Sequence, residues 1–219
     1  AMPGVVDGNG LVKRSTLLGW RNVDVRTPIE RRFSLPVTVN NDATAAMFTE
    51  RLFGKGGPNM MFVRLRRGVG GAVLLGDVPV FGENHAGGEI GHISLDPQGP
   101  PCACGKRGCL ERLVSATSLH ARLQRSDERM RASILREAGT YLGTALSMPV
   151  GLLDLADVCV YGQSDIVNDT LLSAAQAQLD LLTGSSFHTR TIIRRCECEG
   201  EITLRGEALS VLHDYLENR

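Results

Sequence analysis

The residues best suited to chemistry lie in one short segment, GHISLDPQGPPCACGKRGCLE, at positions 91–111. Three of the chain's six cysteines fall within eight positions here, and a histidine precedes the first of them by ten residues. Glycines near the last cysteine permit a turn that brings the sulfurs together. Three thiolates and one imidazole nitrogen complete the tetrahedral shell of a closed structural zinc site. The segment therefore predicts zinc bound by His92, Cys102, Cys104 and Cys109.

Other interpretations of the cysteines stay open. The same segment fits three reduced cysteines in a glycine-rich loop beside an unrelated histidine. A disulfide between Cys102 and Cys104 is disfavoured because one residue separates them. Cys196 and Cys198 could form a second site, but no partner pair is visible, so we interpret them as ordinary strand residues. The distribution of the six cysteines is unlike a secreted disulfide framework.

Length and composition exclude several classes of protein. With 219 residues, 42% of them hydrophobic, the chain can bury a core. Lys plus Arg equals Asp plus Glu, 24 each, so the chain has no basic excess of the kind that binds nucleic acid. No apolar run approaches the roughly 20 residues that cross a bilayer, and the N-terminus does not resemble a signal peptide. We therefore expect a cytoplasmic protein with no membrane partner.

Hydrophobic patterns predict an α/β fold, because strands and helices alternate along the chain. The segment LPVTV at 35–39 predicts a short buried strand, and a helix follows from the polar start at 40–42 to Gly54. Beyond a Gly/Pro break at 54–58, strands are predicted at 60–65 and 71–80, joined by a glycine turn around Gly68, Gly70 and Gly71. The pattern then predicts helices at 130–153, 169–182 and 205–218, and strands at 157–162 and 189–195.

The segment GGEIGHISLDPQGPPCACGKRGCLE, at 87–111, resembles the signature of the ROK family, a group of bacterial sugar kinases and sugar-responsive transcriptional repressors. Residues 3–20, 35–50 and 67–92 extend the resemblance. It implies an actin-like, hexokinase-like (ribonuclease H-like) two-domain α/β fold around a cleft, with a truncated N-terminal domain. Residues 1–54, closed by a C-terminal helix at about 205–219, would be the remnant of that domain. Residues 55–204 would form a larger α/β domain with the zinc-binding loop.

The resemblance also implies a sugar site. Asp42 stands where the family's kinases keep the general base that takes a proton from the sugar hydroxyl. His92 would use one ring nitrogen for zinc and the other for the sugar. Zinc would hold the loop that carries His92 and Glu111, and so would shape the pocket without taking part in chemistry. The residues implied to contact the sugar are Gly10, Asn41, Asp42, Glu89, His92 and Glu111.

Without the resemblance, each of these residues has a plainer interpretation. Asn41 and Asp42 precede an apolar helix, where both residue types are preferred N-caps. Glu89 and Glu111 fit solvated surface charges. Gly10 fits an ordinary turn glycine.

Departures from the kinase pattern favour a sensor over an enzyme. The phosphate-binding hairpin with which the family's kinases begin would lie upstream of AMPGVVD. In the second phosphate loop the kinases carry Gly-Thr, whereas Arg66 and Arg67 stand here before Gly68. Near the adenosine, Gly162 alone remains of a glycine pair. Phosphoryl transfer depends on positioning and neutralising phosphates. We therefore expect a sugar-binding, zinc-stabilised effector domain of a transcriptional regulator, without phosphotransfer.

Two alternatives remain. One is a ROK sugar kinase that lacks its first strands and uses ATP and Mg²⁺ to phosphorylate a hexose or N-acetylhexosamine. The other is a remnant whose core mainly dimerises. The expected partners are a small-molecule sugar and a second copy of the chain, since a sheet without its first strands exposes an edge. DNA would be contacted only through a helix-turn-helix that this chain lacks.

Overall fold

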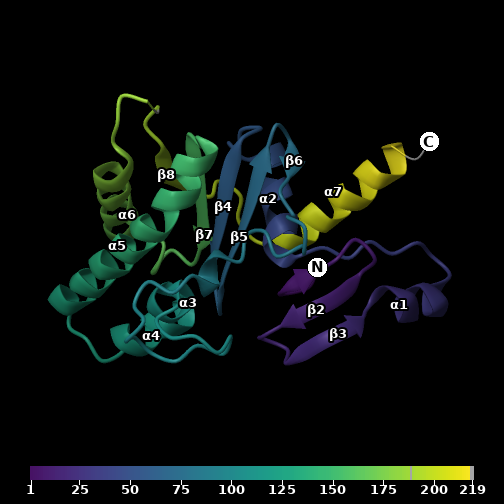
Figure 1. The fold of residues 1–219 in the computed structure, drawn as a ribbon, viewed down its shortest axis with the longest axis horizontal. Coiled ribbons are helices and arrows are strands. Elements are labelled where there is room, and N and C mark those ends of the chain that lie inside the picture. The colour runs from purple at the N-terminus through teal and green to yellow at the C-terminus, as the bar shows by residue number, and fades with distance from the viewer. Residues whose placement is uncertain (188, 218–219) are drawn as a thin grey trace.

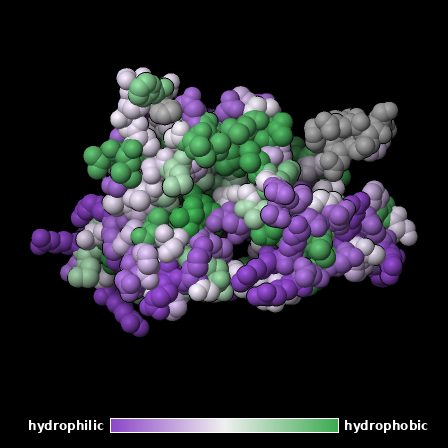
Figure 2. Space-filling view, viewed as in Figure 1, coloured by the Kyte–Doolittle hydropathy of each residue, from purple (hydrophilic) through white to green (hydrophobic). Residues whose placement is uncertain are grey.

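The computed structural model describes residues 1–187 and 189–217 of the chain. Two sheets and their helices form a mixed α/β structure (Figure 1). An antiparallel three-stranded sheet, in the order β1-β2-β3, is followed by the short helix α1 (Arg26–Phe33). Its strands are Val5–Val6 (β1), Leu11–Ser15 (β2) and Trp20–Asp24 (β3). Hydrophilic residues cover this sheet and α1 in the space-filling view (Figure 2).

The larger sheet has five strands in the order β6-β5-β4-β7-β8. Strand β4 lies at its centre, antiparallel to β5 and parallel to β7. Five of the six β4 residues are buried, as expected of a strand covered on both faces. The strands are Met60–Leu65 (β4), Val69–Leu75 (β5), Val78–Pro79 (β6), Asp157–Gly162 (β7) and Ile192–Arg195 (β8).

Side chains of β4 alternate between the two faces of this sheet. Met61, Val63 and Leu65 belong to the core under α5 (Glu128–Leu153) and α6 (Asp169–Thr183). Met60 and Phe62 belong to the core under α2 (Asp42–Phe53), which lies on the opposite face with α7 (Ile202–Glu217). The period of two therefore places Arg64 on the α2 face. Along the chain, β6 and α5 are separated by the 3-10 helix η1 (Ile90–His92) and by the helices α3 (Leu110–Val114) and α4 (Ala116–Leu123).

Most predicted elements of the larger sheet are confirmed. The helix after the 40–42 start is α2, with Asn41 as N-cap and Gly54 as C-cap. The predicted strands at 60–65 and 157–162 are β4 and β7, and the helices at 130–153 and 169–182 lie within α5 and α6. The strand predicted at 189–195 begins only at Ile192. The closing helix begins earlier than predicted, at Ile202, and positions 218–219 lie outside the described residues.

The strand predicted at 35–39 is wrong. This segment has no regular structure and is largely exposed, and it pairs with no strand of the described chain. Beyond it, Asn41 forms an isolated parallel bridge with Met2. An isolated segment cannot form a strand, because its backbone groups need a neighbour. Likewise, the predicted strand at 71–80 is a hairpin that turns at Gly76 and Asp77.

The three-stranded sheet and α1 were not predicted. Their exposed side chains carry little of the apolar periodicity on which such predictions depend. The division of the chain at residues 54–55 stays a prediction, although α2 packs on the larger sheet. Among the described helices, none carries an apolar stretch long enough to cross a bilayer.

Close packing of α7 on α2 holds the start of α2 in place, and we expect Gly206 to be essential for it. A methyl group at Gly206 would overlap the carbonyl oxygen of Ala45. The substitution G206A should therefore lower the free energy of unfolding by about 1–3 kcal/mol, measured by urea denaturation. Gly151, near the end of α5, has open space around it, so G151A is the matched control and should keep stability or raise it by up to about 1 kcal/mol. Equal stability of the two variants would contradict the packing argument.

Candidate functional site

The four predicted metal ligands meet in one cluster. Their ligand atoms all lie within 4.8 Å of one another. The Sγ of Cys102 is 3.6 Å from Nδ1 of His92, and the Sγ atoms of Cys104 and Cys109 are 3.6 Å apart. A tetrahedral zinc shell with its usual bond lengths has S···S and S···N edges of about 3.6–3.8 Å. The donor set and its spacing therefore fit a tetrahedral metal ion.

The loop reaches this geometry through its glycines. Gly105 and Gly108 both have positive φ, 99° and 57°, which favours glycine. A side chain at Gly108 would also overlap the backbone of Asp96. Cys109 becomes the fully buried N-cap of α3. Burial, together with hydrogen bonds to the other two cysteines, raises the pKa of the Cys109 thiol to about 12, so a bound cation would have to displace its proton.

A pocket of about 410 Å³ lies beside the metal cluster. It opens between the three-stranded sheet and the larger sheet, where the space-filling view is hollowed (Figure 2). Ala103, between two of the cysteines, lines it, so the metal loop forms part of its wall. Its volume is within the range of about 300–1,000 Å³ for small-molecule sites. Five of the six predicted sugar residues line it: Asn41, Asp42, Glu89, His92 and Glu111.

Asn41 and Asp42 enter the pocket at the start of α2. The Oδ1 of Asn41 accepts from the N–H groups of Ala43 and Thr44, at 2.8 and 3.2 Å, so the helix-cap role is real. Its Nδ2 donates to the carbonyl oxygen of Gly4 at 2.9 Å, which ties α2 to the smaller sheet. Burial raises the pKa of Asp42 above its usual range, against the opposing charge of Arg64.

His92 uses its two ring nitrogens in different directions. Nδ1 faces the cysteines, and Nε2 is 3.8 Å from Oε2 of Glu89, which lines the pocket. Burial also raises the pKa of Glu89. Glu111 accepts from the N–H of Val69 at 3.2 Å, so its carboxylate closes the glycine turn between β4 and β5. Neither glutamate is a fully solvated surface charge.

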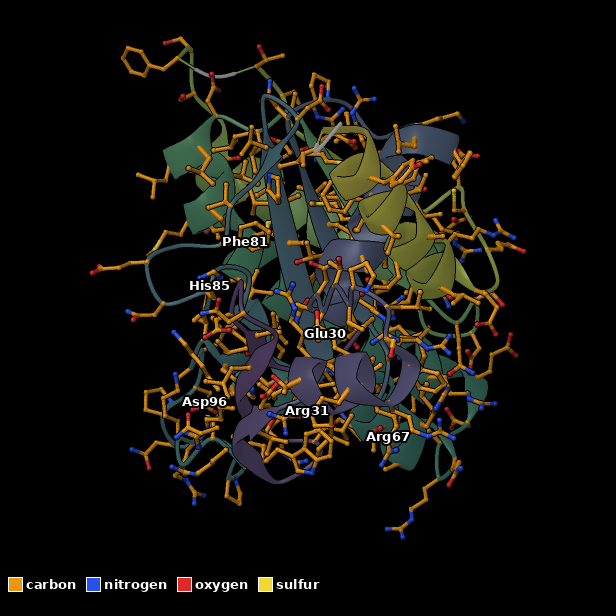
Figure 3. The ribbon with its side chains drawn as sticks, turned by 90° about the vertical axis from the view of Figure 1, so that its right-hand side faces the viewer. Glu30, Arg31, Arg67, Phe81, His85 and Asp96 are labelled. Atoms are coloured by element: carbon orange, nitrogen blue, oxygen red, sulfur yellow. The ribbon has the colours of Figure 1, made fainter. Side chains whose placement is uncertain are left out.

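Gly10 is outside this set. It is buried in the turn before β2 with φ 77°, and a side chain there would overlap Arg26. Gly10 does not line the 410 Å³ pocket, and its geometry is that of a turn glycine. Phe81 and His85, whose rings are 5.9 Å apart, line a smaller neighbouring pocket that also touches Asn41 (Figure 3).

One pocket residue escaped the sequence analysis. Arg64 donates to Oδ2 of Asp42 at 2.8 Å, and both side chains are largely buried, 25% and 20% exposed. Its Nε is buried without a hydrogen-bond partner among the described residues. The available signal was a single charged residue inside the apolar strand MMFVRL. A buried charge of this kind needs a partner.

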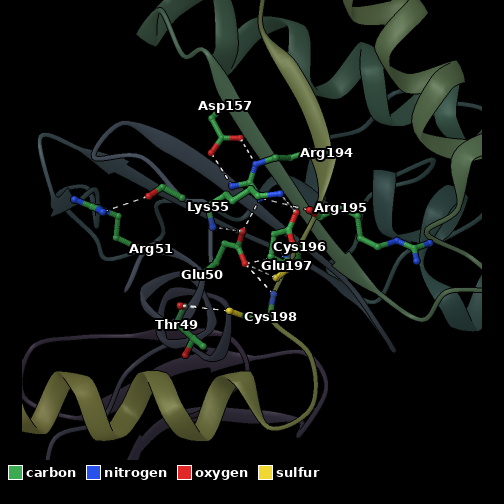
Figure 4. Close-up of polar contacts among 11 residues, drawn as sticks. Thr49, Glu50, Arg51, Lys55, Asp157, Arg194, Arg195, Cys196, Glu197 and Cys198 are labelled. Atoms are coloured by element: carbon green, nitrogen blue, oxygen red, sulfur yellow. Dashed lines mark hydrogen bonds and ion pairs between the residues drawn. The ribbon is translucent and has the colours of Figure 1, made fainter. Parts of the chain in front are cut away.

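A second cluster surrounds the fully buried Glu50 (Figure 4). Ligand atoms of Glu50, Cys159 and Cys196 lie within 4.8 Å of one another. The carboxylate accepts from Arg194 at 2.5 Å, from Sγ of Cys196 at 3.0 Å and from the N–H of Cys198 at 3.2 Å. Protein donors thus satisfy this carboxylate, and we interpret the cluster as structural. Cys196 and Cys198 follow β8, which ends at Arg195. Our interpretation of them as strand residues is therefore wrong.

Among known proteins, the chain is similar in sequence to repressors and to glucokinases. Over 131 residues it is 30% identical to a xylose repressor of Bacillus subtilis (strain 168). This match covers 59% of this chain and 34% of the repressor. Over 121 residues it is 39% identical to a glucokinase of Halalkalibacterium halodurans. This match covers 53% of this chain and 37% of the glucokinase. The matches thus span about a third of the length of these relatives.

Solved structures confirm the actin-like, hexokinase-like α/β fold. A ROK family glucokinase from Streptomyces griseus, in complex with glucose and AMPPNP, matches with a TM-score of 0.82 at 24% identity, over 94% of this chain and 78% of that one. A ROK family transcriptional regulator, a homolog of the E. coli MLC protein, matches with a TM-score of 0.81 at 23% identity, over 94% and 60%. The fold therefore fits regulator and kinase alike.

The model of the ROK family matches residues 1–146. The matched segment includes both α2 and the whole Cys/His cluster. Because it covers 146 of the 219 residues, the chain belongs to the ROK family.

Proposed function

We propose that this chain is a sugar-binding effector domain of a ROK-type transcriptional regulator, stabilised by zinc and inactive in phosphotransfer. The observation that carries the proposal is the convergence of Asn41, Asp42 and Glu89, with His92 and Glu111, on one pocket beside the metal cluster. Carboxylates, an amide and an imidazole are the donors and acceptors that fix sugar hydroxyls. Zinc held by the Cys/His cluster would keep the loop that carries His92 and Glu111 in its folded shape.

Two contacts favour sensing over phosphotransfer. A phosphate cradle uses backbone N–H groups of a glycine turn. Here the carboxylate of Glu111 occupies the Val69 N–H of that turn and would repel a phosphate from it. Oδ2 of Asp42 already accepts from Arg64 at 2.8 Å, so this oxygen is less free to take a proton from a sugar hydroxyl. The other carboxylate oxygen could still orient a hydroxyl by accepting its hydrogen bond.

A ROK sugar kinase is the second candidate, because Asp42 does line the pocket and glucokinases are among the relatives. It would need ATP and Mg²⁺ and a phosphate site that is formed elsewhere. A regulator would contact DNA through a different segment and would pair with a second copy of the chain. Sugar binding would shift the balance between domain arrangements and thereby change DNA affinity.

Calorimetry on zinc-loaded protein tests the proposal with a panel of hexoses and N-acetylhexosamines, with and without MgATP. We expect heat from at least one sugar and no sugar-dependent consumption of ATP. D42N should weaken sugar binding by about 10-fold or more, because a charge-assisted hydrogen bond is lost. Asp165 is exposed and does not line the pocket, so D165N is the control and should bind normally. Sugar-dependent ATP consumption would overturn the absence of phosphotransfer, and no heat from any sugar would overturn the function itself.

A further inference from the structure

We propose that Arg64 is a positioning residue of the sugar site, which fixes the Asp42 carboxylate as an acceptor and presents a donor beside it, so that the pair binds two neighbouring hydroxyls of one sugar. The inference rests on the proposed function, because it assigns a role in ligand binding to a further residue of the same pocket. Arg64 lies on β4 and lines the pocket together with Asp42.

Close packing of α2 on the larger sheet makes the contact between these two side chains. Nη1 of Arg64 donates to Oδ2 of Asp42 at 2.8 Å, and both side chains are largely buried. On β5, Gly70 stands opposite Arg64 in the sheet. A methyl group at Gly70 would lie 3.3 Å from Cβ of Ala43, at the start of α2. The glycine therefore lets the start of α2 approach the sheet, which brings Asp42 within reach of Arg64.

Arg64 uses few of its donors within the protein, although a guanidinium group has several. Within residues 1–187 and 189–217, its side chain makes one hydrogen bond, to Asp42, and its Nε is buried without a partner. Arg194 shows the arrangement expected of a structural arginine, because its three nitrogens donate to Asp157 and Glu50. A buried polar group without a partner is unusual, and a ligand that supplies acceptors would account for the incomplete pairing of Arg64.

The pair offers an acceptor and a donor side by side. The carboxylate of Asp42 would accept a hydrogen bond from one sugar hydroxyl, and an N–H of Arg64 would donate to the oxygen of the next. Both contacts are charge-assisted and therefore stronger than hydrogen bonds between neutral groups. A sugar ring carries hydroxyls on adjacent carbons, which suits such a pair. Asn41 and Glu89 line the same pocket and would bind further hydroxyls.

The charge of Asp42 distinguishes this role from a purely structural one. Burial raises the pKa of Asp42, and the positive charge of Arg64 opposes this rise. The N-terminal amine of Ala1, which pairs with Glu207 at 3.1 Å, also acts to lower this pKa, whereas Glu89 and Asp42 repel each other. Loss of the Arg64 charge should therefore raise the pKa of Asp42 further. A protonated Asp42 is a weaker acceptor, so sugar affinity would be lost at a higher pH than in the unmodified chain. The other charged or titratable groups that line the pocket stay the same in every variant: Arg66, Arg67, His92 and Glu111.

The test is calorimetry on zinc-loaded variants over a range of pH, with glucose, xylose and N-acetylglucosamine as the probes. R64M removes the charge and the donors, so it should weaken sugar binding about 10-fold or more at neutral pH. Its affinity should also fall at a higher pH than that of the unmodified chain. R64K keeps the charge and should keep the unmodified pH profile. R64M should cost much less affinity in D42N than in the unmodified chain, because the two residues act as a pair.

Arg51 offers a matched control, since it pairs with Asp77 at 2.6 Å and does not line the pocket. R51M should keep both the sugar affinity and its pH profile. Unchanged affinity in R64M, with D42N still impaired, would overturn this inference and leave the proposed function standing. Loss of affinity at the same pH in R64M and the unmodified chain would overturn it as well. If R64M does not fold, R64Q is judged by the same criteria. No heat from any sugar with the unmodified chain would overturn both proposals.

Discussion

Replacing Cys104 by serine is expected to reduce bound zinc from one ion per chain to none and to abolish sugar binding. Cys104 is half-buried and within reach of the other three ligands, so serine fits its space but lacks a soft thiolate. Backbone hydrogen bonds such as the one from the N–H of Cys102 to the carbonyl oxygen of Lys106, at 2.8 Å, give the loop its turns, and zinc would hold the four ligand side chains together. In small zinc domains the metal contributes about 10–16 kcal/mol of apparent binding free energy to folding. Elemental analysis gives the zinc content, and calorimetry gives the sugar affinity.

The buried Cys159 provides the control for this experiment, because it lies outside the proposed zinc site. We expect C159S to keep one zinc ion and its sugar affinity. Full zinc content in C104S would show that the proposed ligands are wrong. Two ions in the unmodified chain, with one of them lost in C159S, would show that the Glu50 cluster binds metal and would contradict our interpretation of it.

The second large effect is expected at Glu50, where E50Q should lower the free energy of unfolding by about 3–5 kcal/mol at neutral pH. Glu50 is fully buried and paired with Arg194 at 2.5 Å, and it receives the N–H groups of Glu197 and Cys198. A glutamine would remove the charge and turn an amide NH₂ or a neutral oxygen toward these donors. Urea denaturation of the two proteins at several pH values measures the loss.

The pH dependence of this loss follows from the pKa of Glu50. Burial acts to raise this pKa, but hydrogen bonds from Cys196, Arg194 and Cys198 outweigh burial and lower it below its ordinary value of 4.5. A carboxyl with a lowered pKa stabilises the fold above its ordinary pKa, and this stabilisation is lost as the pH falls through the lowered value. The difference between the unmodified chain and E50Q should therefore be full at neutral pH and shrink in acid.

Glu197 offers a matched surface control in the same region. Its carboxylate pairs with Lys55 at 2.6 Å, but the two side chains are 48% and 70% exposed. Exposed ion pairs contribute about 0–1 kcal/mol, so E197Q should have little effect at any pH. If E50Q costs no more than E197Q, the buried cluster does not stabilise the fold as we infer.

Several features could be predicted because their causes are local in the chain. The metal ligands lie within one loop, and glycines at 105 and 108 supply its turns. Asn41 caps α2 through N–H groups two and three residues away. Apolar periodicity was sufficient for α5 and α6, which bury one face each. Caps, turns and periodic faces depend on neighbours in sequence, so residue types and spacing alone determine them.

Other features depend on contacts between distant segments, which only the tertiary structure decided. The segment at 35–39 has the composition of a strand but lacks a neighbouring strand among the described residues. Arg64 meets Asp42 across 22 residues, and Arg194 meets Glu50 across 144. These pairs follow from the strand order and from the packing of α2 on one face of the larger sheet. Local patterns carry no information on which strands become neighbours, so the charge balance of the pocket could not be predicted from the sequence.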